Sequence, residues 1–309
     1  MTGAAPATDR DALAALARRL PPGVRFGTSS WTFPGWEGIV YSRRYDARRA
    51  AAAMLGEYAR FPLFGTAGID SSFYRPLTAR QLRDYAAVLP AGFRCASKVW
   101  RELTLPESPS FLDPDRFLRE VYEPCAAHFD AHAGPFVFEF GALPARHALT
   151  PGRFAAALDA FFTRLPRDPR FAVEIRTARL LTPTYLAVLR EHDVAHVFNA
   201  WSRMPPIGAQ LDLPDALTGR QVVARLLLPP GGDYESLREA WAPFDRLRAP
   251  SEAVRRDVLR LLAVAVRAAL PAYVLVNNKM EGSAPLTVVA LAERAARELG
   301  PAPAQRPAG

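Results

Sequence analysis

Acidic and basic residues lie within or just after several apolar runs of this sequence, and their side chains could do chemistry. Glu174 and Arg176 stand two residues apart, so a strand would place both on the same face, where they could pair. A glutamate can serve as a general base and an arginine can hold an anion, so we predict Glu174 as a catalytic acid or base. The alternative is a buried ion pair that only fills the interior.

Glu139 lies in an earlier apolar run, one strand before Glu174, and we predict that it assists Glu174 in catalysis. Two neighbouring carboxylates raise the pKa of one of them, which lets one act as an acid and the other as a base near pH 7. Glu139 could instead neutralise Lys98, which follows the preceding run. The sequence leaves both interpretations open.

The remaining candidate residues would bind a ligand rather than react with it. Lys98 could hold a phosphate or carboxylate, form a Schiff base, or act as a counter-ion. Only Lys98 and Lys279 are lysines among 39 basic residues, so a compact ammonium could be required at both positions. Large aromatic residues nearby could stack on a sugar or base, or plug the core. The predicted substrate-binding residues are Lys98, Arg176, Arg225, Asn277, Asn278, Asp70, Tyr74, Arg75, Trp31 and Trp201.

The elements that must position these residues alternate between strand and helix. The predicted strands are apolar with little strict alternation, as expected when both faces are covered. They are Val24–Thr28, Phe64–Ile69, Phe93–Ala96, Phe136–Phe140, Phe171–Ile175, Ala195–Phe198, Val222–Leu228 and Tyr273–Val276. The predicted helices are Asp11–Leu20, Ala47–Ala59, Thr78–Leu89, Asp115–Phe129, Arg153–Leu165, Pro183–His192, Ser251–Leu270 and Leu286–Leu299.

Eight such strands in roughly 250 residues predict an α/β fold, a single-domain (β/α)8 TIM-type barrel. An open doubly wound sheet would have about six strands and a glycine-rich first turn. We expect a helical extension over residues 1–22, the barrel over 23–299 and a disordered tail over 300–309. The proline-rich residues 201–220 show no clear helix and predict a loop over the barrel mouth, and residues 229–233 predict another long connection.

Composition narrows the class of protein. A chain of 309 residues that is 50% hydrophobic can bury a large core, and no stretch approaches the roughly 20 apolar residues that span a bilayer. The first twenty residues lack the apolar core of a signal peptide, so we expect a cytoplasmic protein. Cys95 and Cys125 match no metal spacing and are predicted to be free, buried thiols.

The formal net charge of +8 suggests nucleic acid as one partner, but the arginines are spread along predicted helices and form no basic block. We therefore expect a small-molecule ligand that bears a phosphate or carboxylate, and neither nucleic acid nor a membrane. No histidine lies among the candidate residues and no nucleotide-binding or nucleophile motif is present, so we predict no metal and no cofactor. The sequence does not indicate the oligomeric state.

In five segments the sequence resembles the domain of unknown function 72 family, the YecE-like barrels. The resemblance implies a TIM-type barrel with a polar pocket, and it carries no settled activity. The segments are Gly27-Thr28-Ser29 with Trp31, Asp70 through Arg75, Phe93 through Lys98, Val173 through Arg176, and Asn277-Asn278 followed by Gly282, Ala284 and Pro285.

This chain also departs from the pattern of that family at the expected pocket. Three histidines and a carboxylate that the resemblance would imply are replaced, and Glu139 stands where the family commonly has glutamine. The replacing residues are Thr177, Leu227 and Ser283 for the histidines, and Lys279 for the acidic residue after the paired asparagines; in addition, Gly68, Ile69 and Asp70 stand where a glutamate usually precedes the polar segment.

Two functional hypotheses follow from these residues. The first is a cofactor-independent enzyme that acts on a small anionic or polyhydroxylated metabolite at the strand ends, with Glu174 and Glu139 as the catalytic pair. The second is a non-catalytic barrel that binds a ligand or nucleic acid, which the missing histidines and the basic balance favour.

Overall fold

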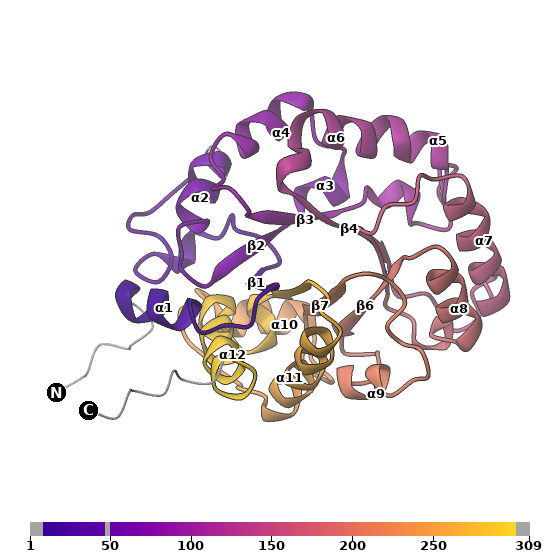
Figure 1. Ribbon diagram of the computed structural model, residues 1–309. Helices are drawn as coiled ribbons and strands as arrows, with labels where there is room; N and C mark the ends of the chain where they lie inside the picture. The colour runs from indigo at the N-terminus through magenta and orange to yellow at the C-terminus, as the bar shows by residue number, and fades with distance from the viewer. Residues whose placement is uncertain (1–8, 47–49, 301–309) are drawn as a thin grey trace.

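The chain folds into a closed barrel of eight parallel strands, as predicted. The computed structural model describes residues 9–46 and 50–300. Each strand pairs with the next, and the last pairs with the first. Figure 1 shows the strands enclosed by a ring of helices. The strands are β1 (Val24–Thr28), β2 (Phe64–Ile69), β3 (Arg94–Lys98), β4 (Ala133–Phe140), β5 (Phe171–Ile175), β6 (Ala195–Ala200), β7 (Val222–Leu226) and β8 (Ala272–Val276).

The helices follow the predicted pattern, with additional short elements in the connections. The α-helices are α1 (Arg10–Ala17), α2 (Ala51–Tyr58), α3 (Ser71–Tyr74), α4 (Ala79–Ala86), α5 (Pro114–Phe117), α6 (Glu123–Phe129), α7 (Pro151–Thr163), α8 (Pro183–Glu191), α9 (Ile207–Leu211), α10 (Tyr234–Trp241), α11 (Glu252–Arg267) and α12 (Ala284–Glu298). Short 3₁₀ segments are η2 (Pro34–Trp36), η3 (Arg101–Leu103), η5 (Asp130–His132), η6 (Ala178–Leu180) and η7 (Asn278–Met280), and η4 (Leu118–Tyr122) is a π-helix.

Helix starts are set by the caps that the sequence displays. Thr150 and Asp113 each stand before a proline and accept a hydrogen bond from a backbone N–H of the first turn, at 3.4 and 3.0 Å. Thr182 does the same for α8. The side-chain oxygen satisfies a donor that the helix leaves open, and proline fits the first turn because it has no N–H to lose.

Strand alternation separates the two sides of the barrel wall. Phe136, Phe138 and Phe140 of β4 pack outward against aromatic rings of α5 and α7, while Val137 and Glu139 occupy the alternate positions that face the interior. A second buried cluster of mostly small or branched side chains fills that interior: Val137, Ala172, Ala195, Val197, Val223 and Tyr273. The core is therefore double, with one layer inside the barrel and one between strands and helices.

The backbones of β1 and β2 approach each other very closely at Gly27. A Cβ atom added at Gly27 would lie 2.0 Å from the carbonyl oxygen of Thr66, far inside contact distance. The register of the two strands shifts at the same point, between Phe26 and Gly27. Glycine is required there because only a residue without a side chain admits the neighbouring backbone.

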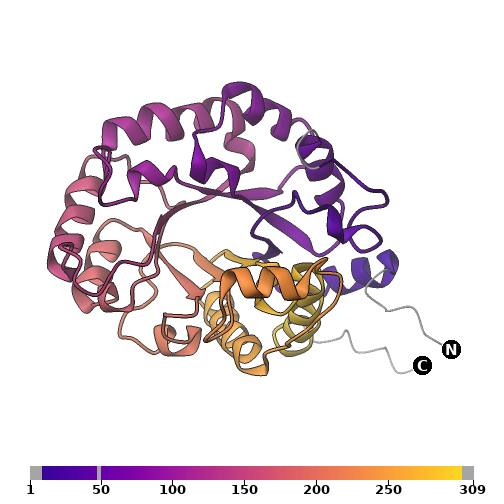
Figure 2. The ribbon, with the colours of Figure 1, turned by 180° about the vertical axis from the view of Figure 1, so that it is seen from behind.

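Three connections differ from the prediction. Residues 201–220, predicted as a loop without a helix, contain α9, whose Gln210 donates from its side-chain amide to the carbonyl of Asn199 at 2.8 Å. The predicted helix over residues 115–129 is interrupted by η4, because Pro124 has no N–H to continue the hydrogen-bond ladder. The connection after β7 leads into α10, which crosses in front of the strands in Figure 2.

The described part of the predicted N-terminal extension, from residue 9, packs onto the barrel as a helix, and residues 1–8 of that prediction lie outside the described residues. α1 lies beside α12, so the first and last described helices are neighbours (Figure 1). Leu13 of α1 is buried in the main core. The predicted disordered tail over residues 300–309 lies outside the described residues except for Gly300, and so do residues 47–49 of the predicted helix 47–59.

Candidate functional site

The interior charges form one layer above the small interior side chains. Glu139, Glu174 and Arg225 each stand two residues beyond an interior position of the same strand, so the alternation of β4, β5 and β7 turns all three inward. Glu139 and Glu174 are direct register partners. We call the resulting group, which lies at the carboxyl ends of the strands, the ion cluster: Asp70, Lys98, Glu139, Glu174, Arg176 and Arg225.

Glu139 is the centre of the ion cluster. Its Oε2 atom accepts hydrogen bonds from Arg225 Nη1 at 2.7 Å and from Arg176 Nη2 at 2.8 Å, and it lies 3.0 Å from Lys98 Nζ. One carboxylate oxygen is thus surrounded by three cations from three other strands or strand ends. The sequence left open whether Glu139 assists Glu174 or neutralises Lys98. The structure contains the contact between Glu139 and Lys98 that the second interpretation requires.

Glu174 is held by two of the same cations. Its Oε1 accepts from Arg176 Nε at 2.9 Å, and its Oε2 accepts from Arg225 Nη1. The predicted pairing of Glu174 with Arg176 is therefore present. Glu174 is completely buried, and Glu139 and Arg225 are nearly so. A buried charge is costly unless an opposite charge lies beside it, and these groups provide that partner for one another.

The neighbouring charges shift the pKa of Glu139 and of Arg225. Burial by itself would raise the pKa of Glu139, but the charges of Arg176, Arg225 and Lys98 outweigh it and hold that pKa well below its ordinary value. Burial by itself would lower the pKa of Arg225, but the charges of Glu174 and Glu139 outweigh burial and raise that pKa above its ordinary value. We expected paired carboxylates to raise the pKa of one of them. For Glu139 the pKa is lowered instead, because the attraction of three nearby cations outweighs the repulsion between the carboxylates.

The cluster reaches solvent only at its rim. The Asp70 side chain is 38% exposed, and its Oδ1 lies 3.4 Å from Lys98 Nζ without forming a hydrogen bond. Arg176 stacks on the ring of Trp201, with 4.3 Å from its guanidinium carbon to the ring centroid, and the Trp201 Nε1 donor has no partner within the described residues. Lys98 lies over the ring of Phe73. The rim therefore holds one buried acceptor and one buried donor that lack a hydrogen-bond partner among the described residues.

A second polar region lies at the same mouth, between the ends of β1 and β8 and helix α10. It is a cavity of about 250 Å³. We call it the lysine cavity, and the residues that matter below are Ser29, Ser30, Tyr234, Phe244, Asn277 and Lys279. The Lys279 Nζ lies 3.8 Å from the centroid of the Tyr234 ring and 5.7 Å from that of Phe244.

Two candidate residues are already engaged within the fold. Trp31 is only 2% exposed, packs edge-on against Tyr85 and donates from Nε1 to the carbonyl of Ala51, so its ring belongs to the core. Asn278 lines the lysine cavity, but its Oδ1 is already taken by Trp36 Nε1 and the Ala284 N–H.

The other candidates lie nearer to solvent. Arg75 lies on the surface, and the side chain of Tyr74 is 68% exposed beside the rim of the ion cluster. The candidate residues that come together are therefore Asp70, Lys98, Glu139, Glu174, Arg176, Arg225 and Trp201.

Sequence reasoning predicted Asn277 and Asn278 of the lysine cavity as binding residues but did not predict Lys279, Ser29 or Tyr234 as binding residues. Lys279 was noted only as one of two lysines and as a departure from the family pattern, and Ser29 only as part of a matching segment. Tyr234 carried no signal, because its role depends on α10, which the sequence did not reveal. The rarity of lysine was the one available signal, and it singled out both Lys98 and Lys279.

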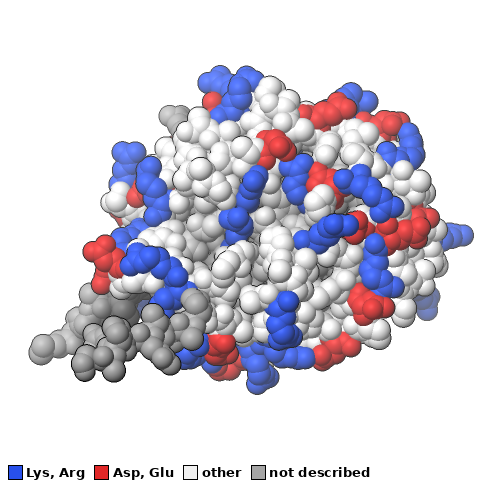
Figure 3. Space-filling model, viewed as in Figure 1, with Lys and Arg blue, Asp and Glu red and all other residues white. Residues whose placement is uncertain are grey.

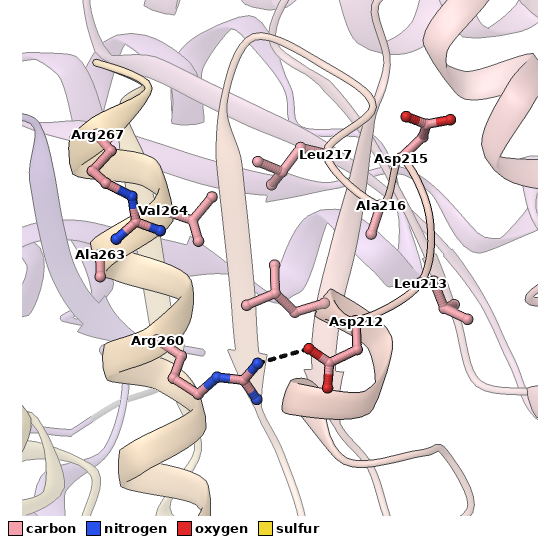
Figure 4. A pocket seen from close by; sticks show the side chains of 10 residues that line it. Asp212, Leu213, Asp215, Ala216, Leu217, Arg260, Ala263, Val264 and Arg267 are labelled. Atoms are coloured by element: carbon pink, nitrogen blue, oxygen red, sulfur yellow. Dashed lines mark hydrogen bonds and ion pairs between the residues drawn. The ribbon is translucent and has the colours of Figure 1, made fainter.

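A larger hollow than the lysine cavity lies elsewhere on the surface. It has about 570 Å³ and runs along the outside of the barrel, between α11 and the segment 211–217 (Figure 4). Arg260 and Asp212 pair across it at 2.7 Å. None of the candidate residues lines it. We interpret this hollow as a groove between packed elements, because it lies on the outer wall and an ion pair crosses it.

Cys95 and Cys125 are free and buried, as predicted. Burial raises the pKa of both thiols, that of Cys125 to about 12. Among the described residues, no helix has the length and apolar character needed to cross a membrane. The same part of the chain holds no group of three or more His, Cys, Asp or Glu side chains arranged to ligate a metal ion.

Comparison with known proteins identifies relatives by family and by fold. The sequence profile of the family described as "Protein of unknown function DUF72" matches residues 25–308. A DUF72 family protein from Enterococcus faecalis has a similar structure, with a TM-score of 0.61 at 14% identity, covering 90% of this chain and 98% of the other. A DUF72 family protein from Thermotoga maritima gives 0.61 at 19% identity, covering 88% and 98%. No protein of curated function matches in sequence.

Proposed function

We propose a function from this chain's own residues, because the chain belongs to the family of proteins of unknown function DUF72, whose description names no activity. The proposal is that the protein binds a small polyhydroxylated metabolite at the rim of the ion cluster and acts on it without a cofactor. The observation that carries it is a pair of buried polar atoms without a hydrogen-bond partner among the described residues, Asp70 Oδ1 and Trp201 Nε1, beside the charges of Lys98 and Arg176.

The charge balance of the ion cluster favours hydroxyl groups over a free anion. Three cations, Lys98, Arg176 and Arg225, face three carboxylates, Asp70, Glu139 and Glu174, so the ionised cluster carries no net charge. An anion would have to displace a carboxylate from its cation. A hydroxyl both donates and accepts, so it can bridge Asp70 and Lys98 without disturbing either charge.

The aromatic ring of Trp201 supports the same ligand class. Arg176 stacks on its ring, and its indole N–H is buried without a hydrogen-bond partner among the described residues. Small-molecule sites commonly combine an aromatic surface with a few fixed polar groups, which is the arrangement at this rim.

Among the carboxylates, Asp70 is the one suited to react. Glu174 is completely buried and Glu139 is held ionised by three cations, so neither is free to exchange a proton with a ligand. Asp70 is partly exposed and keeps an oxygen without a hydrogen-bond partner. The catalytic role that the sequence suggested for Glu174 therefore passes to Asp70 in this proposal, with Lys98 as the adjacent cation that could stabilise a developing oxyanion.

A non-catalytic binding barrel is the second candidate, since two of the three carboxylates are fully used within the cluster. It would use the same rim, and turnover of a bound ligand separates the two. For nucleic acid, the face seen in Figure 3 offers no support, because basic and acidic side chains are intermixed across it rather than gathered in a basic stripe.

A ligand panel tests the proposal. Polyols, monosaccharides, sugar acids and sugar phosphates are screened by thermal shift, and each hit is assayed for turnover. We expect a neutral polyhydroxylated hit whose affinity falls roughly tenfold or more in W201A and D70N. The matched control is W100A, because Trp100 also carries a stacked arginine, Arg116 at 4.7 Å, away from the cluster. A hit that D70N and W201A bind as well as the wild type would refute the proposal.

A further inference from the structure

We propose that the lysine cavity is a separate binding site for a small carboxylate, with Lys279 as its cation. Lys279 is only 7% exposed, and no carboxylate lies within 4.0 Å of its ammonium among the residues that the structure describes. A buried charge without a counter-charge is costly, and an anionic ligand would remove that cost. The inference concerns a different region from the ion cluster and does not depend on the function proposed for it.

The acidic residues nearest in sequence are committed to other partners. Glu281 is held by Arg255 at 2.6 Å, and Glu235 pairs with Arg238 at 2.8 Å. Asp233 accepts from the backbone N–H of Ser236 at the start of α10, at 3.0 Å. The charge of Lys279 is therefore not neutralised by a side chain from its own or the facing element.

Two neutral groups complete a set of donors around the cavity. Ser29 is 4% exposed and lines the cavity, and its hydroxyl has no hydrogen-bond partner in the described part of the chain. The Oδ1 of Asn277 accepts from the backbone N–H of Lys279 at 3.0 Å, which leaves the amide NH₂ group of Asn277 to donate. An ammonium, a hydroxyl and an amide are the donors that the two oxygens of a carboxylate require.

The aromatic residues, the volume and the charge of the cavity together indicate which ligand it can bind. Tyr234 and Phe244 flank the ammonium, so part of its surroundings is aromatic ring rather than solvent, which strengthens its attraction for an anion. A volume of about 250 Å³ lies below the about 300 to 1,000 Å³ of typical ligand pockets. Arg238 also lines the cavity, but it pairs with Glu235, so Lys279 is the lining cation that has no carboxylate partner among the described residues. One such cation matches one negative charge, and a carboxylate therefore suits the cavity better than a phosphate dianion.

The two lysines of the chain allow a direct test. In protein labelled only with ¹⁵N-lysine, the backbone amides of Lys98 and Lys279 give two signals, and each site then has its own reporter. At pH 8, we expect acetate to move the Lys279 signal along a saturating curve while the Lys98 signal stays in place. Sodium chloride at equal ionic strength should move neither. Neutral polyols that bind the ion cluster would move the Lys98 signal instead.

Two variants control this titration. S29A removes one donor without changing charge, and it should weaken acetate binding roughly fivefold. K279M should abolish the rise in unfolding temperature that acetate gives the wild type. The proposal is overturned if the Lys279 signal follows ionic strength alone, if S29A binds acetate as the wild type does, or if K279M keeps the acetate effect. Tighter binding of phosphate than of acetate would contradict the assignment to a carboxylate.

Discussion

The ion cluster and the lysine cavity lie at the same barrel mouth and use buried charge in opposite ways. In the ion cluster each cation contacts at least one carboxylate, and Glu139 alone contacts three cations. In the lysine cavity the ammonium of Lys279 contacts aromatic rings and, among the described residues, no carboxylate. The difference teaches that charged residues at a barrel mouth need not be a catalytic site: a fully partnered group can be structure, and an unpartnered group points to a ligand.

The largest expected effect comes from breaking the ion cluster. Glu174→Gln keeps the size of the side chain but leaves Arg225 and Arg176 with one carboxylate fewer in the interior. We expect the free energy of unfolding to fall by about 3 to 5 kcal/mol, measured by urea denaturation. The matched control is D115N, which removes the surface pair of Arg164 and Asp115, 2.8 Å apart with both side chains more than half exposed, and should cost less than about 1 kcal/mol. Equal losses in the two variants would show that the cluster is not structural.

His196 is a buried titratable residue outside both regions, and it shows what burial costs a side chain that has no opposite charge as a partner. Burial lowers the pKa of His196 to about 4, and its ring contacts Tyr185 Oη at 3.1 Å and Gln210 Oε1 at 3.3 Å. Its pKa in the folded protein is below the unfolded value of about 6.5, so its contribution is complete above pH 6.5 and is lost as the pH falls toward 4. Over that range we expect a loss of about 3 kcal/mol.

The His196→Gln variant isolates this loss from the protonation of carboxylates. Urea midpoints of the wild type and H196Q are compared between pH 7 and pH 4. The wild type should lose more stability than H196Q over this range, with most of the difference arising below pH 6.5. Parallel curves would show that His196 is not held neutral by its surroundings.

The barrel could be predicted from the sequence because its signals are local. Apolar runs of strand length and caps such as Thr150 and Asp113 act within a few residues, so the order and approximate bounds of the strands follow from them. The pairing of Glu174 with Arg176 was also predictable, since a strand turns residues i and i+2 to the same side.

The environment of each charge could not be predicted. Three cations converge on Glu139 from β3, β7 and the end of β5, and strand register alone decides that convergence. Lys279 becomes buried because Tyr234 of α10 reaches it from a helix that the sequence did not reveal. Trp31 was predicted at the mouth because it follows β1, but its ring turns into the core against Tyr85. Side chains that depend on distant elements carry no local signal.

The most direct test of the comparison is the stability of Lys279→Met in buffer without carboxylates. Methionine keeps the stem of the side chain and removes the unpaired charge, whose desolvation is only partly offset by Tyr234. We expect the free energy of unfolding, measured by urea denaturation, to rise by on the order of 1 kcal/mol, and saturating acetate to reduce or reverse this difference by stabilising only the wild type. A loss of several kcal/mol, as expected for Glu174→Gln, would instead make Lys279 a structural charge and contradict the account.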